Sequence, residues 1–98
     1  MQRYELMFIL NPTLSDEALS AQLERVNGYV STYGGTIEET LHTAPWGRRR
    51  LAYPIKNFQD GYYVVQRLVL NQTQSSSLER DLNINENVLR YMLTRVGA

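Results

Sequence analysis

The sequence contains no cysteine, so it can form neither a disulfide framework nor a thiolate metal site. That absence fits a reducing compartment. Net charge is also missing, because ten Lys and Arg residues balance ten Asp and Glu residues. A chain without a general basic field can bind nucleic acid only through a local group of cations.

Long apolar runs are absent as well. The longest run, LMFIL, is far too short to span a bilayer or to form the core of an export signal. The N-terminus lacks the basic-then-apolar pattern of such a signal, and we expect a cytoplasmic protein. With 98 residues, 43% of them hydrophobic, the chain suits one folded domain that spans residues 1–98.

Two amphipathic segments predict helices. The longer, residues 14–35, has Ser15 at a capping position and a stripe of apolar residues at steps of three and four. The pair Gly34 and Gly35 provides its C-terminal stop. A second, short helix is expected within residues 71–83, lying lightly on the sheet, because two leucines there are four residues apart.

Strands are predicted on either side of these helices. They cover residues 2–10, 36–55, 62–70 and 86–96. The first should be buried on both faces, because only Glu5 interrupts its apolar run. The second is long and interrupted, and its Pro45 and Gly47 suit an edge strand with a bulge. Residues 56–61, KNFQDG, are predicted to make the turn after it, with Asp60-Gly61 as the hairpin signal.

The order of these elements is βαββαβ, the ferredoxin-like arrangement. Right-handed crossovers then give an α+β sandwich, in which a four-stranded antiparallel sheet carries both helices on one face. The first and third strands become central, and the second and fourth strands become the edges. The arginine-rich second strand is therefore expected at an edge.

The residues with catalytic potential are not expected to lie together as an active site requires. His42 is the only histidine and has no evident orienting partner. Glu38 and Glu39 are adjacent on a predicted strand, so they should point to opposite faces and cannot form a carboxylate pair. The sequence has neither a glycine-rich phosphate loop nor a cluster with metal-ligand spacing. We therefore expect no enzyme, no bound metal and no cofactor.

One alternative for the fold is an RNA-recognition module, which shares the βαββαβ order and stacks bases on aromatic residues of its central strands. Residues 7–12, MFILNP, are similar to the shorter signature of that module. Residues 60–67, DGYYVVQR, depart from the longer signature, because Val64 and Arg67 occupy aromatic positions. The stacking platform is largely lost, which disfavours this mode of RNA binding.

The densest cationic feature is PWGRRRLAYPI, residues 45–55. Charged residues on an edge strand can simply discourage aggregation. Strand alternation, however, sends Arg48 and Arg50 to one face and Arg49 to the other, so one ion-pair partner cannot absorb all three. Arginine also suits bidentate phosphate contact better than lysine does. We therefore predict a docking edge that is basic at one end and apolar at the other.

Four blocks of the sequence, in collinear order, carry a family resemblance. They are RYELMFILNP (3–12), WGRRRLAYPI (46–55), GYYVV (61–65) and ENVLRYM (86–92). Together they resemble the bacterial family of the small-subunit ribosomal protein numbered six. The resemblance implies a ferredoxin-like, non-catalytic constituent of the small ribosomal subunit. It further implies binding to ribosomal RNA of the central domain together with the small-subunit ribosomal protein numbered eighteen.

The resemblance also suggests which residues meet each partner. Arg49 and Arg50 would face the RNA, with Arg3, Asn87 and Arg90 as further RNA candidates. Arg48, in the arginine run, and Lys56, which follows the predicted edge strand, complete the expected RNA-binding set. The expected contacts to the protein partner are Trp46, Leu51, Ala52 and Tyr53. No membrane or small-molecule substrate is implied.

A second class of function stays open on the fold alone, since a fold does not determine a function. It is a regulatory or ligand-binding ferredoxin-like domain that dimerises through a sheet edge.

Overall fold

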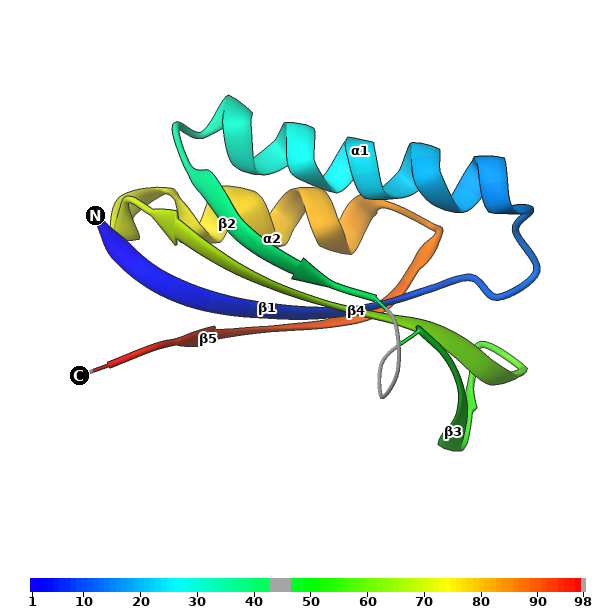
Figure 1. Cartoon of the computed structure of the whole chain (residues 1–98). Helices are drawn as coiled ribbons and strands as arrows, with labels where there is room; N and C mark the ends of the chain where they lie inside the picture. Colours follow the sequence, from blue (N-terminus) through cyan, green and yellow to red (C-terminus); the bar gives the residue numbers. More distant parts are fainter. Residues whose placement is uncertain (43–46, 98) are drawn as a thin grey trace.

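Residues 1–42 and 47–97 are described by the computed structural model, in which two helices cover one face of an antiparallel sheet (Figure 1). The elements are β1 (Gln2–Leu10), α1 (Asp16–Thr32), β2 (Thr36–Leu41), β3 (Gly47–Ile55), β4 (Phe58–Leu70), the 3₁₀ turn η1 (Gln72–Gln74), α2 (Ser75–Ile84) and β5 (Val88–Arg95). This is the predicted ferredoxin-like order, with the second strand divided in two.

The sheet has the order β2-β4-β1-β5, and β3 also pairs with β4. β4 is 13 residues long. The side of β4 that faces away from β1 pairs with β2 along residues 65–69 and with β3 along residues 58–63. The prediction that the first and third strands are central is confirmed. The predicted single strand over residues 36–55, expected to be interrupted, is divided into two strands that share the edge. The bulge expected at Pro45 lies outside the described residues.

The β3–β4 hairpin turns at Lys56 and Asn57, which have φ angles of 50° and 68°. Two consecutive residues with positive φ are typical of a type I′ hairpin turn. The turn therefore lies within the predicted range of residues 56–61, but its predicted signal, Asp60 and Gly61, lies inside β4. Gly61 is needed there for packing, since a Cβ atom would lie 2.3 Å from the Ile9 Cγ2 atom.

Helix α1 has the predicted ends. The Ser15 side chain accepts a hydrogen bond from a backbone N–H of the first turn, over 3.2 Å. At the other end, the Gly35 N–H donates to the Val30 carbonyl (2.9 Å) and the Gly34 N–H to the Ser31 carbonyl (3.0 Å), which is a Schellman motif.

Within residues 1–42 and 47–97, no helix has the length and apolar character needed to cross a membrane.

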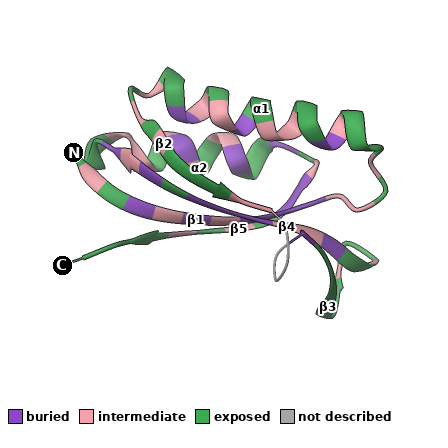
Figure 2. Cartoon of the chain, viewed as in Figure 1, coloured by how far each residue is buried: buried purple, intermediate pink, exposed green. Residues whose placement is uncertain are grey.

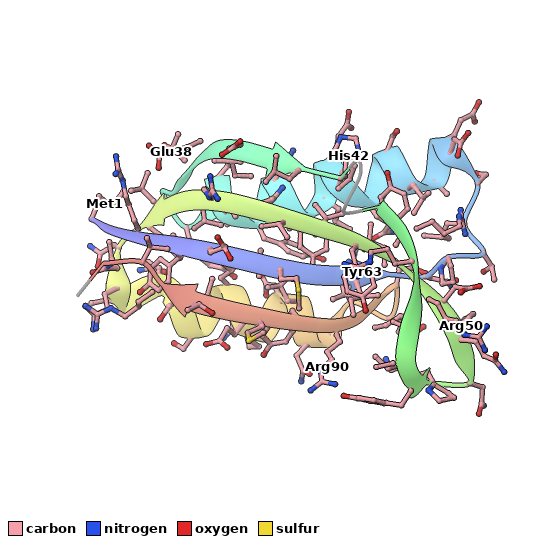
Figure 3. All side chains as sticks on the ribbon, turned by 60° about the horizontal axis from the view of Figure 1, so that its bottom comes forward. Met1, Glu38, His42, Arg50, Tyr63 and Arg90 are labelled. Atoms are coloured by element: carbon pink, nitrogen blue, oxygen red, sulfur yellow. The ribbon has the colours of Figure 1, made fainter. Side chains whose placement is uncertain are left out.

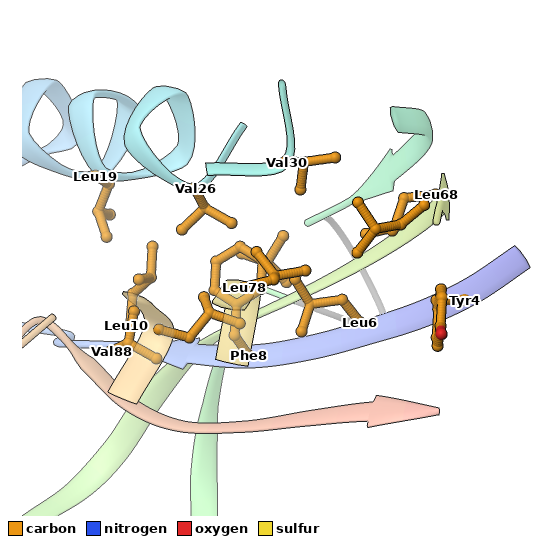
Figure 4. Packing of buried hydrophobic residues seen from close by; sticks show 13 residues of the cluster. Tyr4, Leu6, Phe8, Leu10, Leu19, Val26, Val30, Leu68, Leu78 and Val88 are labelled. Carbon is orange, nitrogen blue, oxygen red and sulfur yellow. The ribbon is translucent and has the colours of Figure 1, made fainter. Parts of the chain in front are cut away.

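The main core lies between the helices and one face of the sheet (Figures 2 and 4). It consists of alternate residues of β1 and β4 and the inner stripes of both helices: Tyr4, Leu6, Phe8, Leu10, Leu19, Val26, Val30, Val64, Leu68, Leu70, Leu78, Leu82 and Val88. The expectation that the second helix lies lightly on the sheet is wrong. Leu78 and Leu82 are fully buried, so α2 is anchored in the core.

The opposite face of the sheet carries no helix. Glu5 and Met7 of β1 are only partly buried there, so the prediction that the first strand is buried on both faces is wrong for most of its length. Ile9 is the exception. The β3–β4 hairpin curls toward the helix-free side, where Ile9 packs with Leu51 and Leu89 in a second, smaller cluster (Figure 1).

Candidate nucleic-acid and protein interface

The helix-free face of the sheet has two chemically different halves, and Figure 3 looks onto it. One half, near the N-terminus and Glu38, is ionic. The other half, near Tyr63, Arg90 and the β3–β4 hairpin, is apolar with cations around it. The residues predicted for function fall mainly in this second half.

The ionic half is paired internally. Arg67 Nη1 lies 2.9 Å from Glu39 Oε2, and Arg67 Nε lies 3.7 Å from Glu5 Oε2. Arg3 Nε lies 3.6 Å from Glu38 Oε1. Arg3 was expected at the RNA together with the arginine run, but the structure places it in this other half and opposite a carboxylate.

A β-bulge explains why both glutamates reach arginines on this face. The register of β2 against β4 shifts between Ile37 and Glu39, which inserts an extra residue at Glu38. The prediction that Glu38 and Glu39 point to opposite faces is therefore wrong. Each carboxylate pairs with its own arginine, Arg3 or Arg67.

The apolar half forms a groove of about 320 Å³ between the β3 segment and strands β1 and β5. Its lining residues are Met7, Ile9, Leu51, Ala52, Tyr53, Ile55, Tyr63, Arg90, Tyr91 and Met92. Tyr53 and Met92 are each 55% exposed, so large side chains there remain open to a partner. Burial raises the pKa of Tyr91 above its ordinary value of 10.0.

Three of the four residues predicted for a protein partner, Leu51, Ala52 and Tyr53, line this groove together. The fourth, Trp46, lies outside the described residues. Sequence reasoning missed the walls that β1 and β5 provide. In the sequence, these walls were signalled only by the alternation of side chains along β1 and by the apolar Met92 on a predicted edge strand.

The three consecutive arginines of β3 are exposed and have different neighbours. Arg48 Nη1 donates to the Pro12 carbonyl in the turn before α1. The Arg49 guanidinium carbon lies 5.3 Å from the centroid of the Tyr63 ring, on the groove side. The predicted alternation is thus visible for this pair. The Arg50 side chain has neither a hydrogen bond nor an ion pair with any residue that the structure describes.

Two further predicted cations, Lys56 and Arg90, line a common hollow beside the hairpin. Arg90 Nη1 donates to the Tyr53 hydroxyl, and the Arg90 guanidinium carbon lies 5.7 Å from the centroid of the Tyr53 ring. Lys56 and Arg90 both line a second hollow, of about 230 Å³. The structure therefore brings these two residues together, although they are 34 positions apart in the sequence.

Asn87, another RNA candidate, occupies the turn before β5. Its backbone N–H donates to Asn85 Oδ1 and its carbonyl accepts from the Asn11 N–H, each over 2.9 Å. These bonds give the Asn87 backbone a structural role, and its side chain is half-buried. Asn87 is not a lining residue of the groove or of the second hollow.

Groups with catalytic potential remain scattered. His42 does have a neighbour that the sequence did not reveal, since its Nδ1 atom lies 3.1 Å from the Tyr62 hydroxyl. This contact joins the residue after β2 to the central strand β4 and includes no carboxylate. Among the described residues, no three His, Asp or Glu side chains gather as a metal site would require.

Comparisons with known proteins agree on one family. A model of the family described as ribosomal protein S6 matches residues 3–95. The small ribosomal subunit protein bS6 of Dictyoglomus turgidum is 39% identical over 94 residues, covering 96% of this chain and 94% of its own length. The protein of the same name from Clostridium novyi is 40% identical over 93 residues, covering 95% of each chain.

Solved structures show the same similarity. The crystal structure of 30S ribosomal protein S6 from Thermotoga maritima superposes with a TM-score of 0.88 at 27% identity, over 97% of this chain and 87% of that one. The P2 domain of the chemotaxis kinase CheA, from the same organism and in complex with CheY, gives a TM-score of 0.63 at 14% identity over 97% and 98% of the two chains. At that identity the likeness is one of fold alone.

Proposed function

This chain belongs to the ribosomal protein S6 family, and from that premise we propose that it binds ribosomal RNA of the central domain jointly with the small-subunit ribosomal protein numbered eighteen. As a family member it is a protein of the small ribosomal subunit, the ribonucleoprotein particle that acts in translation in the bacterial cytoplasm. The family is one of structural proteins rather than enzymes.

The observation that carries the proposal is the position of β3 beside the groove. One segment of nine residues presents three exposed arginines at its start and three groove-lining residues, Leu51, Ala52 and Tyr53, directly after them. Phosphate groups suit the arginine end, because a guanidinium can donate two parallel hydrogen bonds to phosphate oxygens. A protein side chain suits the groove, because the groove is mostly apolar.

The two ligands would therefore share one end of the molecule. Among the described arginines, Arg50 is the strongest candidate for a phosphate contact, because its side chain has no hydrogen bond or ion pair with a described residue. The Arg49 guanidinium lies over the face of the Tyr63 ring. Arg48 is tied to the Pro12 carbonyl and mainly fixes the position of β3. The groove would receive an apolar segment of the protein partner.

The formal net charge of zero supports a joint mechanism. Nonspecific attraction to RNA comes from a general positive field, which this chain lacks. A few local cations give a limited number of phosphate contacts, and a partner that supplies further cations would complete the binding surface.

Reconstitution tests this proposal. A small-subunit RNA fragment from the central domain is titrated with this protein alone, with the partner alone and with both, and binding is followed by filter retention. We expect weak binding by this protein alone and tight binding in the presence of the partner. Tight binding without any partner effect would contradict joint recognition.

A pull-down from bacterial lysate separates the proposal from the regulatory-domain alternative. Recovery of small ribosomal subunits and one small basic protein supports the proposal. Recovery of a homodimer with a bound metabolite would favour the alternative.

A further inference from the structure

Arg90 belongs to two hollows at once. It lines the groove together with Tyr53, and it lines the second hollow together with Lys56. Figure 3 shows Arg90 on the half of β5 that lies nearer to the hairpin. Arg90 therefore forms part of the wall between a surface suited to protein and a hollow that contains a second cation.

The second hollow has the chemistry of a phosphate site. Its polar lining residues are Lys56, Asn83, Arg90 and Tyr91. Among the described residues, no carboxylate lines it. Two cations brought together without an anion repel each other, and an entering phosphate removes that repulsion. The guanidinium can hold two phosphate oxygens, and the ammonium acts as a point charge that the Asn83 amide can supplement.

Each cation reaches the hollow from a defined position. Lys56 lies in the two-residue hairpin turn, where its φ angle is 50°. Arg90 is held by the Tyr53 hydroxyl, which accepts its Nη1 hydrogen bond, and by the Tyr53 ring. A guanidinium has five N–H donors, so the bond to Tyr53 leaves others for a phosphate.

We propose that Lys56 and Arg90 form a binding site for one phosphate group of the RNA backbone, and that Tyr53 couples this site to the groove by positioning Arg90. This inference rests on the proposed function. It adds a phosphate site apart from the arginine run, and a physical route by which the protein partner strengthens RNA binding.

The coupling follows from the burial of Tyr53. Tyr53 is 55% exposed in the isolated protein, so water competes for its hydroxyl and for Arg90. A partner segment in the groove excludes that water, and a hydrogen bond is stronger in a less polar environment. Arg90 is then held in the orientation that phosphate needs. By linkage, RNA at this site strengthens binding of the partner by the same factor.

Charge-removing variants test the phosphate site. Lys56→Gln and Arg90→Gln are compared with the control Arg95→Gln, which removes the same charge from the far end of β5. With the partner present and the central-domain RNA fragment as ligand, Lys56→Gln and Arg90→Gln should each weaken binding about tenfold. Each should also reduce the salt slope of log K by about 0.7–0.9, the value for one phosphate contact. The control should change neither quantity.

The coupling is tested with Tyr53→Phe, which keeps the ring in the groove and removes only the hydroxyl. We expect unchanged affinity for the partner in the absence of RNA, but a several-fold smaller enhancement of RNA binding by the partner. The double variant Tyr53→Phe with Arg90→Gln should bind no worse than Arg90→Gln alone, since both changes act through one contact. Arg90→Lys should restore the salt slope but not the full enhancement, because lysine lacks the guanidinium fork.

The outcomes distinguish this inference from the proposed function. If Lys56→Gln and Arg90→Gln behave like Arg95→Gln while the unmodified protein binds RNA with its partner, the phosphate site is wrong and the proposed function stands. If Tyr53→Phe retains the full enhancement, the coupling is wrong. If the unmodified protein does not bind RNA with its partner, the proposed function fails and this site fails with it.

Discussion

Three adjacent arginines of one strand have three different environments. The Arg48 side chain donates to the Pro12 carbonyl, the Arg49 guanidinium lies over the Tyr63 ring, and the Arg50 side chain has no hydrogen bond or ion pair with the described residues. Residue type therefore does not determine the role of an arginine here. Strand alternation separates the first two, and the curvature of the hairpin decides what each one meets.

The double variant Arg49→Ala with Arg50→Ala tests the RNA-binding role of the run. Folding should be nearly unchanged, because exposed charges contribute only about 0–1 kcal/mol. Assembly with RNA and partner should weaken, with the salt slope falling by about one per lost phosphate contact. Denaturant unfolding and filter binding at several salt concentrations provide the two measurements. An unfolded double variant would show that the arginines are structural instead.

A tyrosine on the helix side gives the fold a dependence on alkaline pH. The Tyr33 hydroxyl donates to Asp81 Oδ2 over 2.5 Å and so joins the end of α1 to α2. This hydrogen bond, followed by burial, raises the pKa of Tyr33 above its ordinary value of 10.0. A raised pKa means that the folded state favours the neutral phenol. The stabilisation is complete below the unfolded pKa and is lost as pH rises through the folded pKa.

We therefore expect the free energy of unfolding to fall above about pH 10, and to fall less steeply in Tyr33→Phe. Denaturant unfolding at several pH values between about 8 and 11 measures this. Some alkaline dependence should persist in the variant, because burial also raises the pKa of Tyr91. An identical pH profile for Tyr33→Phe and the unmodified protein would exclude the Tyr33–Asp81 bond as its cause.

At the scale of single elements, α1 is the best predicted part of the molecule. Its cap at Ser15, its apolar stripe and its stop at Gly34 are all local signals, and the structure contains each of them. Local signals suffice for this helix because its ends are stabilised by residues within one turn of them.

A matched pair of glycine variants checks this account of α1. Gly34 has a φ angle of +78°, and a Cβ atom there would meet nothing within 4 Å, so Gly34→Ala introduces only backbone strain. The expected cost is about 1–2 kcal/mol. Gly28→Ala, inside the same helix and equally open, should instead stabilise by about 0.5–1 kcal/mol. Thermal and denaturant unfolding report both. Effects of the same sign at the two positions would contradict the Schellman end.

The second strand was predicted less well, for identifiable reasons. The turn at Lys56 and Asn57 contains no glycine, so the Asp60-Gly61 pair gave a stronger but misleading turn signal. Gly61 is a glycine because Ile9 approaches it, which is a long-range contact. The bulge at Glu38 was also invisible, because a register shift depends on the partner strand.

At the scale of the whole molecule, the two faces of the sheet have different tasks. The helix side contains the main core (Figure 2), while Tyr53 and Met92 on the other side are each 55% exposed. A small domain cannot bury both faces of its sheet with only two helices. The face without helices is therefore available for binding.

One variant on each face tests this division. Leu78 is fully buried and Met92 is 55% exposed. Leu78→Ala should cost about 2–5 kcal/mol of folding stability, whereas Met92→Ala should stay within about 0.5 kcal/mol. Met92→Ala should instead weaken binding of the protein partner, measured by calorimetry. A large loss of stability in Met92→Ala would show that the groove is part of the folding core.

The sequence by itself determined the element order, the capped helix, the central and edge strands, and the position of the arginine run on an edge strand. Each of these follows from local periodicity, capping residues or the rules of chain connection. Only the tertiary structure decided which cations lie together. Lys56 and Arg90 line one hollow, and Arg3 lies in the other half of the sheet, because the hairpin curls across the sheet and packs on Ile9. Such proximity depends on contacts between distant residues, which no local pattern records.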